Sequence, residues 1–537
     1  MRTCKGTASM RLWTIGILAM VCTLASSSTV AADVDWPSYN RTLSSDRYSA
    51  LGEINRSNVK TLKVTCTFDT GIQTSFQSGI IEVAGVLYGT TEMDIFAIDP
   101  RTCAQKWRVH ESYESASPLK VNRGVAYLDG RLFRGTQDGR VLAYEATTGK
   151  RLWAAQIADP KLGETVPAAP IAWNGLVFIG NAGGDNKGVK GRVYALDAAS
   201  GKTVWKFHMV PSNPGADLAL GWGNAADVPV TGGATWTSYT LDPTSGLLYV
   251  PGGNPAPDFD HHLRPGNNLY SGSIVVLDAK AGAYKTHYSI APADYHDADV
   301  SSAPTLLTTR AGKHLVAEAP KDGYLHAFDL QSGTRVYANA ITRIENRSVP
   351  FSEHPVHFCP GTQGGSEWNG AAYDPATNLI YTGAVDWCAT VTLAPEQKTK
   401  SVADGKPWSA NDAASEKETF GKLDPPAAWA GWIYATDADS GATAWKFRAP
   451  FPVMSGVTPT AGGLVFVGDM GGTLYAFDAQ SGEPLWSQKI GGALGGGVIT
   501  YQTEGVQRIA VATGMTSPIW PTEKTTAKVI VLSVATR

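Results

Sequence analysis

The chain carries, from Ala195 to Trp205, the sequence Ala-Leu-Asp-Ala-Ala-Ser-Gly-Lys-Thr-Val-Trp, and variants of this stretch recur from one end to the other. Each copy contains a small residue, an apolar residue, an acidic residue, two or three turn formers, a glycine and an aromatic residue. The clearest copies lie at residues 143–153, 327–337, 435–445 and 476–486. Weaker copies lie at 97–107, where Cys103 replaces the glycine, at 276–282, and around Asp242 and Asp374. The stretch is therefore a repeat unit.

The spacing of the copies matches one blade of a β-propeller. Their acidic residues are Asp99, Glu145, Asp197, Asp242, Asp278, Asp329, Asp374, Asp437 and Asp478. Most neighbours in this series lie about 40–50 residues apart, the length of one four-stranded blade. Short β-rich runs precede them, such as residues 86–89, 176–180 and 464–468. We predict an all-β fold: an eight-bladed β-propeller of four-stranded antiparallel sheets, closed so that the sheet edges are protected.

The Asp-x-x-x-Gly part of each copy predicts a turn. The aspartate is expected to accept hydrogen bonds from the backbone amides that follow it, and the glycine to adopt a positive φ. The aromatic residue that ends the copy is expected to pack between adjacent sheets. Each blade therefore needs its neighbours to bury that side chain.

Residues 1–32 differ in composition from the rest of the chain. Basic residues at positions 2, 5 and 11 precede an apolar run from Leu12 to Leu24, and small residues end the segment before Asp33. This pattern is typical of a secretory signal peptide, so we predict that residues 33–537 form a single domain in the periplasm. No later segment predicts a transmembrane helix. Loss of the three basic residues changes the net charge from −3 to −6, which argues against nucleic acid as a partner.

Four cysteines follow residue 32, and an even number in an exported protein indicates disulfides. Sequence order favours the pairs Cys66–Cys103 and Cys359–Cys388, because each pair would lie within one blade or its neighbour. No Cys-x-x-Cys-His motif for haem attachment occurs in the sequence. Electrons that leave this protein are therefore expected to pass to a separate protein.

Residues 390–426 interrupt the repeat. This polar segment is rich in Lys, Glu, Ala and Asp and accounts for the long gap between Asp374 and Asp437. Two interpretations stay open: a surface insertion, and a loop that docks a partner or covers the functional site.

Two loop regions outside the repeat carry side chains suited to a hard cation. Residues 251–258, with 264–270 after them, are rich in Asn, Asp, Pro and Gly. Residues 294–299 hold three carboxylates in six positions. Carboxylate and amide oxygens are the ligands that calcium prefers, although acidic residues in loops also serve only to cap turns.

Two further patterns are less specific. The glycine-rich residues 180–191 fit a loop that binds an anion or approaches a metal, and equally a hairpin loop. Zinc is disfavoured because the four candidate histidines lack a Cys or Glu partner at a suitable spacing. These histidines are His261, His262, His354 and His357.

Two short motifs are more specific than the repeat. They are Gly253-Asn254-Pro255-Ala256-Pro257 and Val121-Asn122-Arg123-Gly124-Val125-Ala126-Tyr127. On these motifs the chain resembles the quinoprotein alcohol dehydrogenases, eight-bladed propellers that bind pyrroloquinoline quinone (PQQ) and a metal on the ring axis. The resemblance begins with the motif at residues 35–40, ends with residues 471–476, and so covers essentially all of the mature chain.

The resemblance implies roles for particular residues. Asp297 corresponds to the catalytic base. The implied PQQ-binding residues are Arg123, which pairs with a carboxylate, Trp236, which stacks, Lys321, near the quinone oxygens, Gln77 and Asp386. The implied metal ligands are Asn254, Asp297, Asp299, Asn186 and Asp185. Calcium is the expected metal, with a lanthanide as the alternative because Asp299 resembles an extra carboxylate of lanthanide-using relatives.

The sequence also departs from the family pattern. Asn186 stands where the family usually has a metal-binding glutamate, with Asp185 beside it. Residues 117–118, Ser-Pro, replace an adjacent cysteine pair that covers the cofactor in many members. Val385 or Asp386 stands near a usual cofactor-binding Asn, and Met454 near a usual Trp.

The resemblance implies an exported enzyme that oxidises an alcohol. Asp297 would accept the alcohol proton while hydride passes to metal-polarised PQQ, and the electrons would go to a separate acceptor such as a cytochrome c. The alternative is a non-catalytic exported propeller that acts as a scaffold or ligand sensor. The presence together of Asp297, Asn254, Arg123 and Trp236 favours the enzyme, because a scaffold has no physical need for them.

Overall fold

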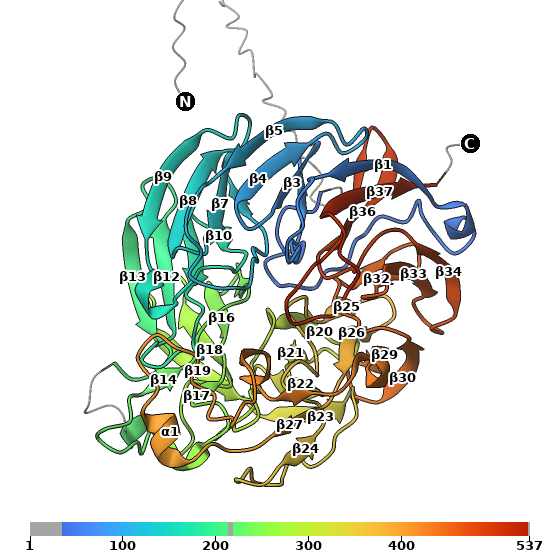
Figure 1. The fold of residues 1–537 in the computed structure, drawn as a ribbon. Coiled ribbons are helices and arrows are strands. Elements are labelled where there is room, and N and C mark those ends of the chain that lie inside the picture. The colour runs from blue at the N-terminus through green and yellow to red at the C-terminus, as the bar shows by residue number, and fades with distance from the viewer. Residues whose placement is uncertain (1–34, 213–217, 535–537) are drawn as a thin grey trace, which may run out of the picture. The chain divides into compact units, whose positions relative to one another are not determined.

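The fold is a ring of eight sheets. The computed structural model describes residues 35–212 and 218–534. Within these residues the backbone forms eight four-stranded antiparallel sheets, arranged around a common centre (Figure 1). The prediction of an eight-bladed propeller is confirmed. The predicted signal peptide, residues 1–32, lies outside the described residues.

The first seven blades follow one another along the chain, with the strands of each in sequence order. Blades 1 and 2 contain β2 (Ile81–Val83), β3 (Val86–Thr90), β4 (Asp94–Ile98) and β5 (Gln105–His110), then β6 (Ala126–Leu128), β7 (Arg131–Gly135), β8 (Arg140–Glu145) and β9 (Arg151–Gln156). Blades 3 and 4 contain β10 (Ile171–Trp173), β11 (Leu176–Gly180), β12 (Arg192–Asp197) and β13 (Thr203–His208), then β15 (Thr240–Asp242), β16 (Leu247–Pro251), β18 (Ser273–Asp278) and β19 (Tyr284–Ser289). Blades 5 and 6 contain β20 (Thr305–Thr308), β21 (His314–Glu318), β22 (Tyr324–Asp329) and β23 (Arg335–Ala340), then β25 (Ala372–Asp374), β26 (Leu379–Asp386), β29 (Ala430–Asp437) and β30 (Thr443–Ala449). Blade 7 contains β31 (Thr458–Thr460), β32 (Leu464–Gly468), β33 (Thr473–Asp478) and β34 (Pro484–Lys489).

The eighth blade joins the two ends of the chain. Its three inner strands are C-terminal: β35 (Val498–Thr503), β36 (Val506–Thr513) and β37 (Lys528–Ser533). Its outer strand is the N-terminal β1 (Lys63–Asp69), which pairs antiparallel with β37. The ring is therefore closed by hydrogen bonds between the first and last strands of the propeller (Figure 1).

The hydrophobic core lies between neighbouring blades. One buried cluster combines Ile81, Tyr88 and Ile95 of blade 1 with Leu132 and Leu142 of blade 2. Equivalent clusters join the other blades. Because each sheet buries its apolar residues only against the next sheet, the closed ring stabilises all of them together.

The Asp-x-x-x-Gly turn joins the third and fourth strands and receives an aromatic residue from the preceding blade. In blade 3, Asp197 Oδ1 accepts a hydrogen bond from the Ser200 amide at 2.8 Å, and Gly201 has φ 73°. Trp153 of blade 2 donates from Nε1 to the Ala198 carbonyl at 3.1 Å. A Cβ on Gly201 would lie 2.6 Å from the Trp153 ring. The predicted turn and packing are confirmed, and the glycine is needed for both conformation and space.

The same docking recurs at several junctions of the ring but not at all of them. Between blades 4 and 5, Thr286 stands at the tryptophan position, and no described atom lies within 4 Å of a Cβ built on Gly333. Trp107, Trp205 and Trp445 donate in the same way to the carbonyls of Ala146, Ala279 and Ala479. At the junction between blade 8 and blade 1, cysteines replace both the tryptophan and the glycine. Cys66 of β1 holds the tryptophan position, since it lies at the bulge that Trp107 occupies in β5, and Cys103 holds the glycine position with φ 58°.

The described residues contain two disulfides, and both predicted pairings are confirmed. Cys66 bonds to Cys103, with a Cα–Cα distance of 5.7 Å, and Cys359 bonds to Cys388. The first one replaces the tryptophan-glycine contact at the junction where the chain ends meet. A covalent bond therefore fixes β1 to blade 1.

Asp242 and Asp374 do not mark blades, so this part of the repeat assignment is wrong. Each lies in the turn between the first and second strands of a blade, β15–β16 and β25–β26. These two blades carry their third-to-fourth strand turns at Asp278 and Asp437. The local turn is the same, because the Gly246 amide bonds to the Asp242 carbonyl four residues back. A similar turn in a different place therefore imitated the repeat.

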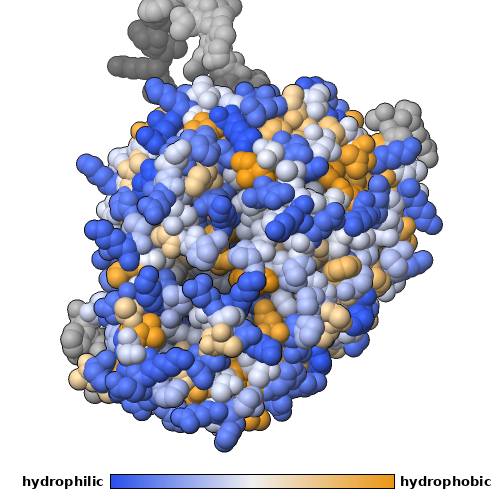
Figure 2. Space-filling view, in the orientation of Figure 1, coloured by the Kyte–Doolittle hydropathy of each residue, from blue (hydrophilic) through white to orange (hydrophobic). Residues whose placement is uncertain are grey.

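The insertion between β26 and β29 carries short elements of its own. Residues 390–426 contain α1 (Glu396–Lys400), η6 (Glu416–Glu418) and β28 (Lys422–Leu423). β28 completes a small sheet with β24 (Val356–Phe358) and β27 (Ala389–Val391). In the described part of the chain, no helix has the length and apolar character needed to cross a membrane. Figure 2 shows that hydrophilic side chains cover most of the visible face, with apolar side chains in small patches.

The buried Glu318 gives the stability of the fold a defined pH dependence. Its side chain, at the end of β21, is 1% exposed and accepts a hydrogen bond from Ser302 Oγ at 2.8 Å. Burial raises its pKa from 4.5 to about 8. Unfolding therefore releases a proton between these pH values, and the free energy of unfolding falls with rising pH by up to about 1.4 kcal/mol per pH unit.

We expect Glu318→Gln to remove this part of the pH dependence, because glutamine keeps the shape and stays neutral. Urea unfolding at pH 5 and pH 8 checks it: the stability of the variant relative to the parent should rise between the two values. An equal difference at both pH values would show that Glu318 is not held protonated.

Candidate cofactor and metal site

Two carboxylates and one ammonium group form the centre of the site. Lys321 Nζ lies 2.8 Å from Asp299 Oδ2 and 3.3 Å from Asp297 Oδ2, and all three side chains are buried. Asp294 shapes the loop that carries both acids, because its carboxylate accepts the amides of His296 and Ala298. Asp297 itself has φ 59°, a conformation that non-glycine residues adopt rarely and that clusters at functional sites.

The loop after β16 brings further side-chain oxygen atoms close to Asp299. The Asn254 amide N donates to Asp299 Oδ1 at 2.8 Å, and Asn254 Nδ2 donates to Asp258 Oδ1 at 2.9 Å. Arg264, which is fully buried, bonds to the carbonyls of both Asp258 and Asp294. This arginine therefore ties the two acid-bearing loops together.

The carboxylates of Asp185, Asp258, Asp297 and Asp299, which we call the acidic group, outnumber the single ammonium group of Lys321 among them. Burial and the neighbouring carboxylates raise the pKa values of Asp258 and Asp297 well above the usual range. Burial, with Asp299 next, raises the pKa of Asp185 to about 6, and Asp185 also interacts with Asn254. Asp258 Oδ2 is buried without a hydrogen-bond partner among the described residues. Four carboxylates around one ammonium group fit a hard cation with oxygen ligands.

A second part of the site is aromatic and cationic. The Arg123 guanidinium lies 4.7 Å from the ring centre of Trp236 and 5.1 Å from that of Trp368. Lys321 Nζ lies 5.6 Å from the Trp236 ring centre, on the side of the acidic group. Arg123 Nε is buried without a hydrogen-bond partner in the described residues. An indole face beside two cations, one with an unpaired N–H, fits a flat polycarboxylate such as PQQ.

Gln77 and Glu367 border this aromatic part. Gln77 lies in a segment that pairs with the Arg123 segment, since the Gly79 amide donates to the Arg123 carbonyl. Burial raises the pKa of Glu367 to about 7, although Lys321 opposes the shift. Gln77 Oε1 and Glu367 Oε1 are both buried with no hydrogen-bond partner in the described part. Such unpaired groups mark a site where a bound molecule or water supplies the missing contacts.

The structure brings most of the predicted site residues together and leaves two apart. The side-chain Nδ2 of Asn186 donates to the carbonyls of Leu162 and Gly163, whereas its neighbour Asp185 interacts with the acidic group. The Asp386 carboxylate bonds to Arg343 and to Trp432 Nε1.

The other candidate at that position, Val385, packs in the cluster that contains Trp236 and Trp368. Successive side chains of a strand point to opposite faces, so only one of the pair 385 and 386 reaches the cluster.

Sequence reasoning missed three residues of the site. Asp258 lies at the end of the oxygen-rich stretch 251–258, four residues after Asn254, but no motif gives it a role of its own. Glu367 and Trp368 lie outside every motif. Nothing in their local sequence separates them from ordinary loop residues, because only the closed ring brings them beside Arg123.

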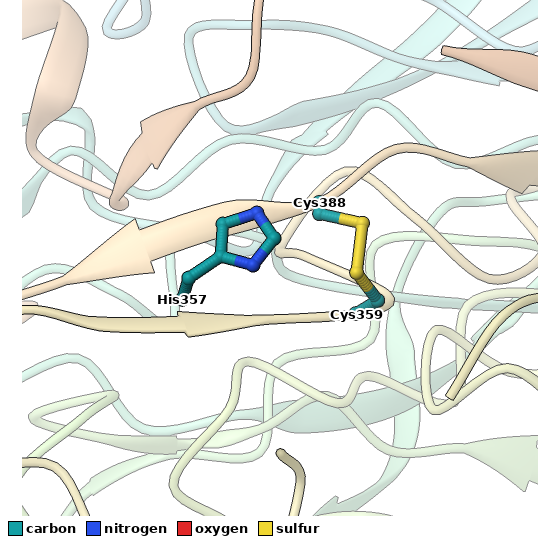
Figure 3. A group of neighbouring side chains, drawn as sticks. All are labelled: His357, Cys359 and Cys388. Carbon is teal, nitrogen blue, oxygen red and sulfur yellow. A yellow bond between two sulfur atoms is a disulfide. The ribbon is translucent and has the colours of Figure 1, made fainter. Parts of the chain in front are cut away.

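One of the candidate histidines, His357, lies beside a disulfide. His357 lies beside Cys359 and Cys388, with the candidate ligand atoms within 4.8 Å of one another (Figure 3). The two sulfur atoms are bonded to each other, so neither is a free thiolate for a metal. His357 Nε2 lies 3.1 Å from the Asp424 carboxylate instead.

Known proteins share both the fold and the sequence. The alcohol dehydrogenase (quinone) dehydrogenase subunit of Acetobacter aceti is 32% identical over 540 residues, covering 89% of this chain and 71% of that protein. The structure of quinohemoprotein alcohol dehydrogenase ADHIIG of Pseudomonas putida HK5 superposes with a TM-score of 0.84 at 26% identity, covering 94% and 81% of the two chains. A europium-containing methanol dehydrogenase superposes with a TM-score of 0.81 at 25% identity, covering 93% and 98%.

The family model described as "PQQ: Glucose/ethanol/alcohol dehydrogenase, beta-propeller domain" matches residues 36–355 and 338–509. These matches span most of the propeller, including the acidic group and the indole-guanidinium pair. The chain therefore belongs to the family of PQQ-dependent glucose, ethanol and alcohol dehydrogenases.

Proposed function

We propose that this PQQ-dependent alcohol dehydrogenase uses Asp297 as its catalytic base and passes electrons to a separate cytochrome c. The observation that carries the proposal is the contact between Asp297 and Lys321, whose ammonium also lies near the Trp236 ring. A proton acceptor, a cation and a stacking surface thus occur in one buried group. Oxidation of an alcohol at a quinone needs these three functions together.

Four residues would hold PQQ. Trp236 offers the stacking surface, and Arg123 and Lys321 offset the negative charge of the carboxylates and of the quinone oxygens. Gln77 Oε1, beside the Arg123 segment, has no hydrogen-bond partner among the residues that the structure describes. When bound, PQQ supplies the quinone that accepts hydride.

The acidic group would hold the metal. The proposed ligands are Asp185, Asn254, Asp258, Asp297 and Asp299, and Asn186 is left out because its side chain bonds elsewhere. We propose calcium as the metal, as is commoner in the family, with a lanthanide as the alternative. The lanthanide is supported by the four carboxylates of the acidic group and by the likeness to a europium-containing methanol dehydrogenase.

Asp297 would act as the base while the metal keeps it ionised. Burial raises its pKa in the free protein, and a cation beside it favours the charged form. Its Oδ2 then has one donor, Lys321 Nζ at 3.3 Å, and further acceptor capacity for an alcohol proton. The indoles around Trp236 exclude water and strengthen the electrostatic contacts.

The acceptor and the compartment complete the proposal. The chain has no haem-attachment motif, and the name of one relative, lupanine 17-hydroxylase [cytochrome c], includes that acceptor. We assign the protein to the periplasm because of the predicted signal peptide and the two disulfides. The deciding experiment reconstitutes the purified protein with PQQ and either calcium or a lanthanide, then screens alcohols by dye reduction. No PQQ binding in either state would favour the scaffold or sensor instead.

Trp236→Ala and Arg123→Ala are each expected to weaken PQQ binding, because one removes the stacking surface and the other the carboxylate partner. A loss of about 1–3 kcal/mol, or roughly 10-fold to 100-fold in affinity, is expected for each. Fluorescence titration with PQQ measures it, and Trp153→Phe on the outer side of blade 2 serves as the control. Parent-like affinity in both variants would place the cofactor elsewhere.

A further inference from the structure

The loop that carries Asp185 also carries a buried lysine with an unusual set of partners. Lys187 is 8% exposed, and its Nζ donates to the main-chain carbonyls of Lys400 and Val402 at 2.6 and 2.8 Å. Nζ also lies 5.4 Å from the ring centre of Trp408. All three contacts belong to the insertion at residues 390–426. A buried ammonium group therefore holds the insertion to the loop of a proposed metal ligand.

The main chains of the two segments are paired as well. The Lys187 amide donates to the Lys406 carbonyl, and the Gly405 amide donates to the Lys187 carbonyl, both at 2.9 Å. The Trp408 amide donates to the carbonyl of Asp185 itself at 2.7 Å. Residues 405–408 thus run along residues 185–187 and limit the positions open to the Asp185 carboxylate.

The same segment contacts the second acidic loop. The Phe259 amide, one residue after Asp258, donates to the Ser409 carbonyl at 2.9 Å. The Trp408 side chain is 1% exposed, packs with Ala256 and Leu263 of that loop, and donates from Nε1 to the Thr399 carbonyl at 2.9 Å. One short segment is therefore bonded to the loops of Asp185 and of Asp258.

The acidic group needs such support because its members repel one another. Asp185 and Asp299 carry like charges in a buried place, so a free loop would let Asp185 move away from the other carboxylates. Residues that hold a ligand loop in place affect metal affinity almost as strongly as the ligands do.

We propose that residues 396–409, which we call the strap, position the metal site, with Lys187 as the residue that fastens the strap to the Asp185 loop. The inference rests on the proposed function, since it concerns the same metal. Residues 390–426 were open to two interpretations, a surface insertion and a loop with a role at the functional site or in docking a partner. The proposal favours a role at the functional site. Lys187 is a positioning residue, because it touches the strap and no proposed ligand side chain.

Lys187→Met tests the proposal because a purely electrostatic role and a positioning role of Lys187 predict opposite changes in metal affinity. Methionine keeps the length and apolar stem of lysine and removes the ammonium group. If Lys187 acted only as a nearby positive charge, its loss would tighten binding of a cation. If it fastens the strap, its loss should weaken metal binding by about 10-fold or more. Lys187→Arg, which can donate to the same two carbonyls, should bind metal close to the parent value.

The measurement is a direct titration of PQQ-saturated protein with calcium and with terbium(III). Lys190→Met is the matched control, because Lys190 lies in the same loop and its Nζ donates to a main-chain carbonyl outside the strap, that of Pro211. Metal affinity of this variant should match that of the parent.

Amide hydrogen exchange supplies a second readout. Metal should increase the protection of residues 405–409 in the parent, because coupling between two sites is reciprocal. In Lys187→Met this increase should be lost. A merely structural lysine would lower protection equally with and without metal.

The outcomes separate the inference from the proposed function. Unchanged or tighter metal binding by Lys187→Met, with a parent that binds metal and oxidises alcohol, overturns the positioning role alone. A parent that binds neither PQQ nor metal overturns both. Weaker binding in Lys187→Met, near-parent binding in Lys187→Arg and Lys190→Met, and loss of the metal-dependent protection together support the role of the strap.

Discussion

Asp297→Asn is expected to lower alcohol turnover by a factor on the order of 100 or more while PQQ still binds. Asparagine keeps the size of aspartate and an oxygen donor, but it does not accept a proton at neutral pH. The loss should therefore fall on kcat. PQQ titration should give a parent-like value, because the contacts of Arg123 and Trp236 are unchanged.

The matched control is Asp374→Asn, another buried carboxylate, which accepts the Ala376 amide in the β25–β26 turn. Its turnover should stay near that of the parent. Metal titration of Asp297→Asn separates the role of Asp297 as the base from its role as a metal ligand. Excess metal restores turnover that is lost through weaker metal binding, but it does not restore turnover that is lost with the base. Turnover that survives in metal-saturated Asp297→Asn would exclude Asp297 as the base.

The second large effect is expected at the junction of the chain ends. Cys66→Ser with Cys103→Ser should lower the free energy of unfolding by about 2–4 kcal/mol, because the disulfide closes a long loop. Guanidinium unfolding of the oxidised parent and of the double variant measures this difference. Five other interfaces have an aromatic contact on a glycine turn, whereas this one would have neither the disulfide nor such a contact.

Cys66→Trp with Cys103→Gly offers a rescue taken from the other blades. Trp153 on Gly201 shows the contact that these residues should form, and Gly suits the φ of 58° at position 103. This variant should be more stable than the double serine variant, and its stability should not change with a thiol reductant. Equal stability of the two variants would show that Cys66 and Cys103 do not hold the tryptophan and glycine positions.

The sequence predicted the fold well because the repeat expresses a local requirement in every copy. An aspartate that accepts amides, a glycine with positive φ and a tryptophan that docks on the glycine of the next blade are recognisable within eleven residues. The errors arose because a local pattern does not show which two strands a turn connects. Asp242 and Asp374 make a similar turn two connections earlier in the blade, and only strand pairing separates the two kinds of turn.

The site was less predictable because neighbouring residues on a chain point in different directions. Asp185 interacts with the acidic group while Asn186 bonds to a different loop, and no pattern within residues 180–191 decides between them. Val385 and Asp386 differ in the same way on adjacent positions of β26. Glu367 enters the site only through contacts between blades, which a single sequence does not display.

The pairing of β1 with β37 also constrains how the protein is made. β1 is synthesised before any blade, and its hydrogen-bonding partner β37 is synthesised only after the other seven blades. Until then β1 is an open strand edge, the kind of surface that recruits other chains. Cys103 is made soon after Cys66, so in an oxidising compartment the disulfide can form early and hold β1 beside blade 1. The nascent chain would thus carry, from its first blade onward, a covalently anchored template on which its final strand completes the ring.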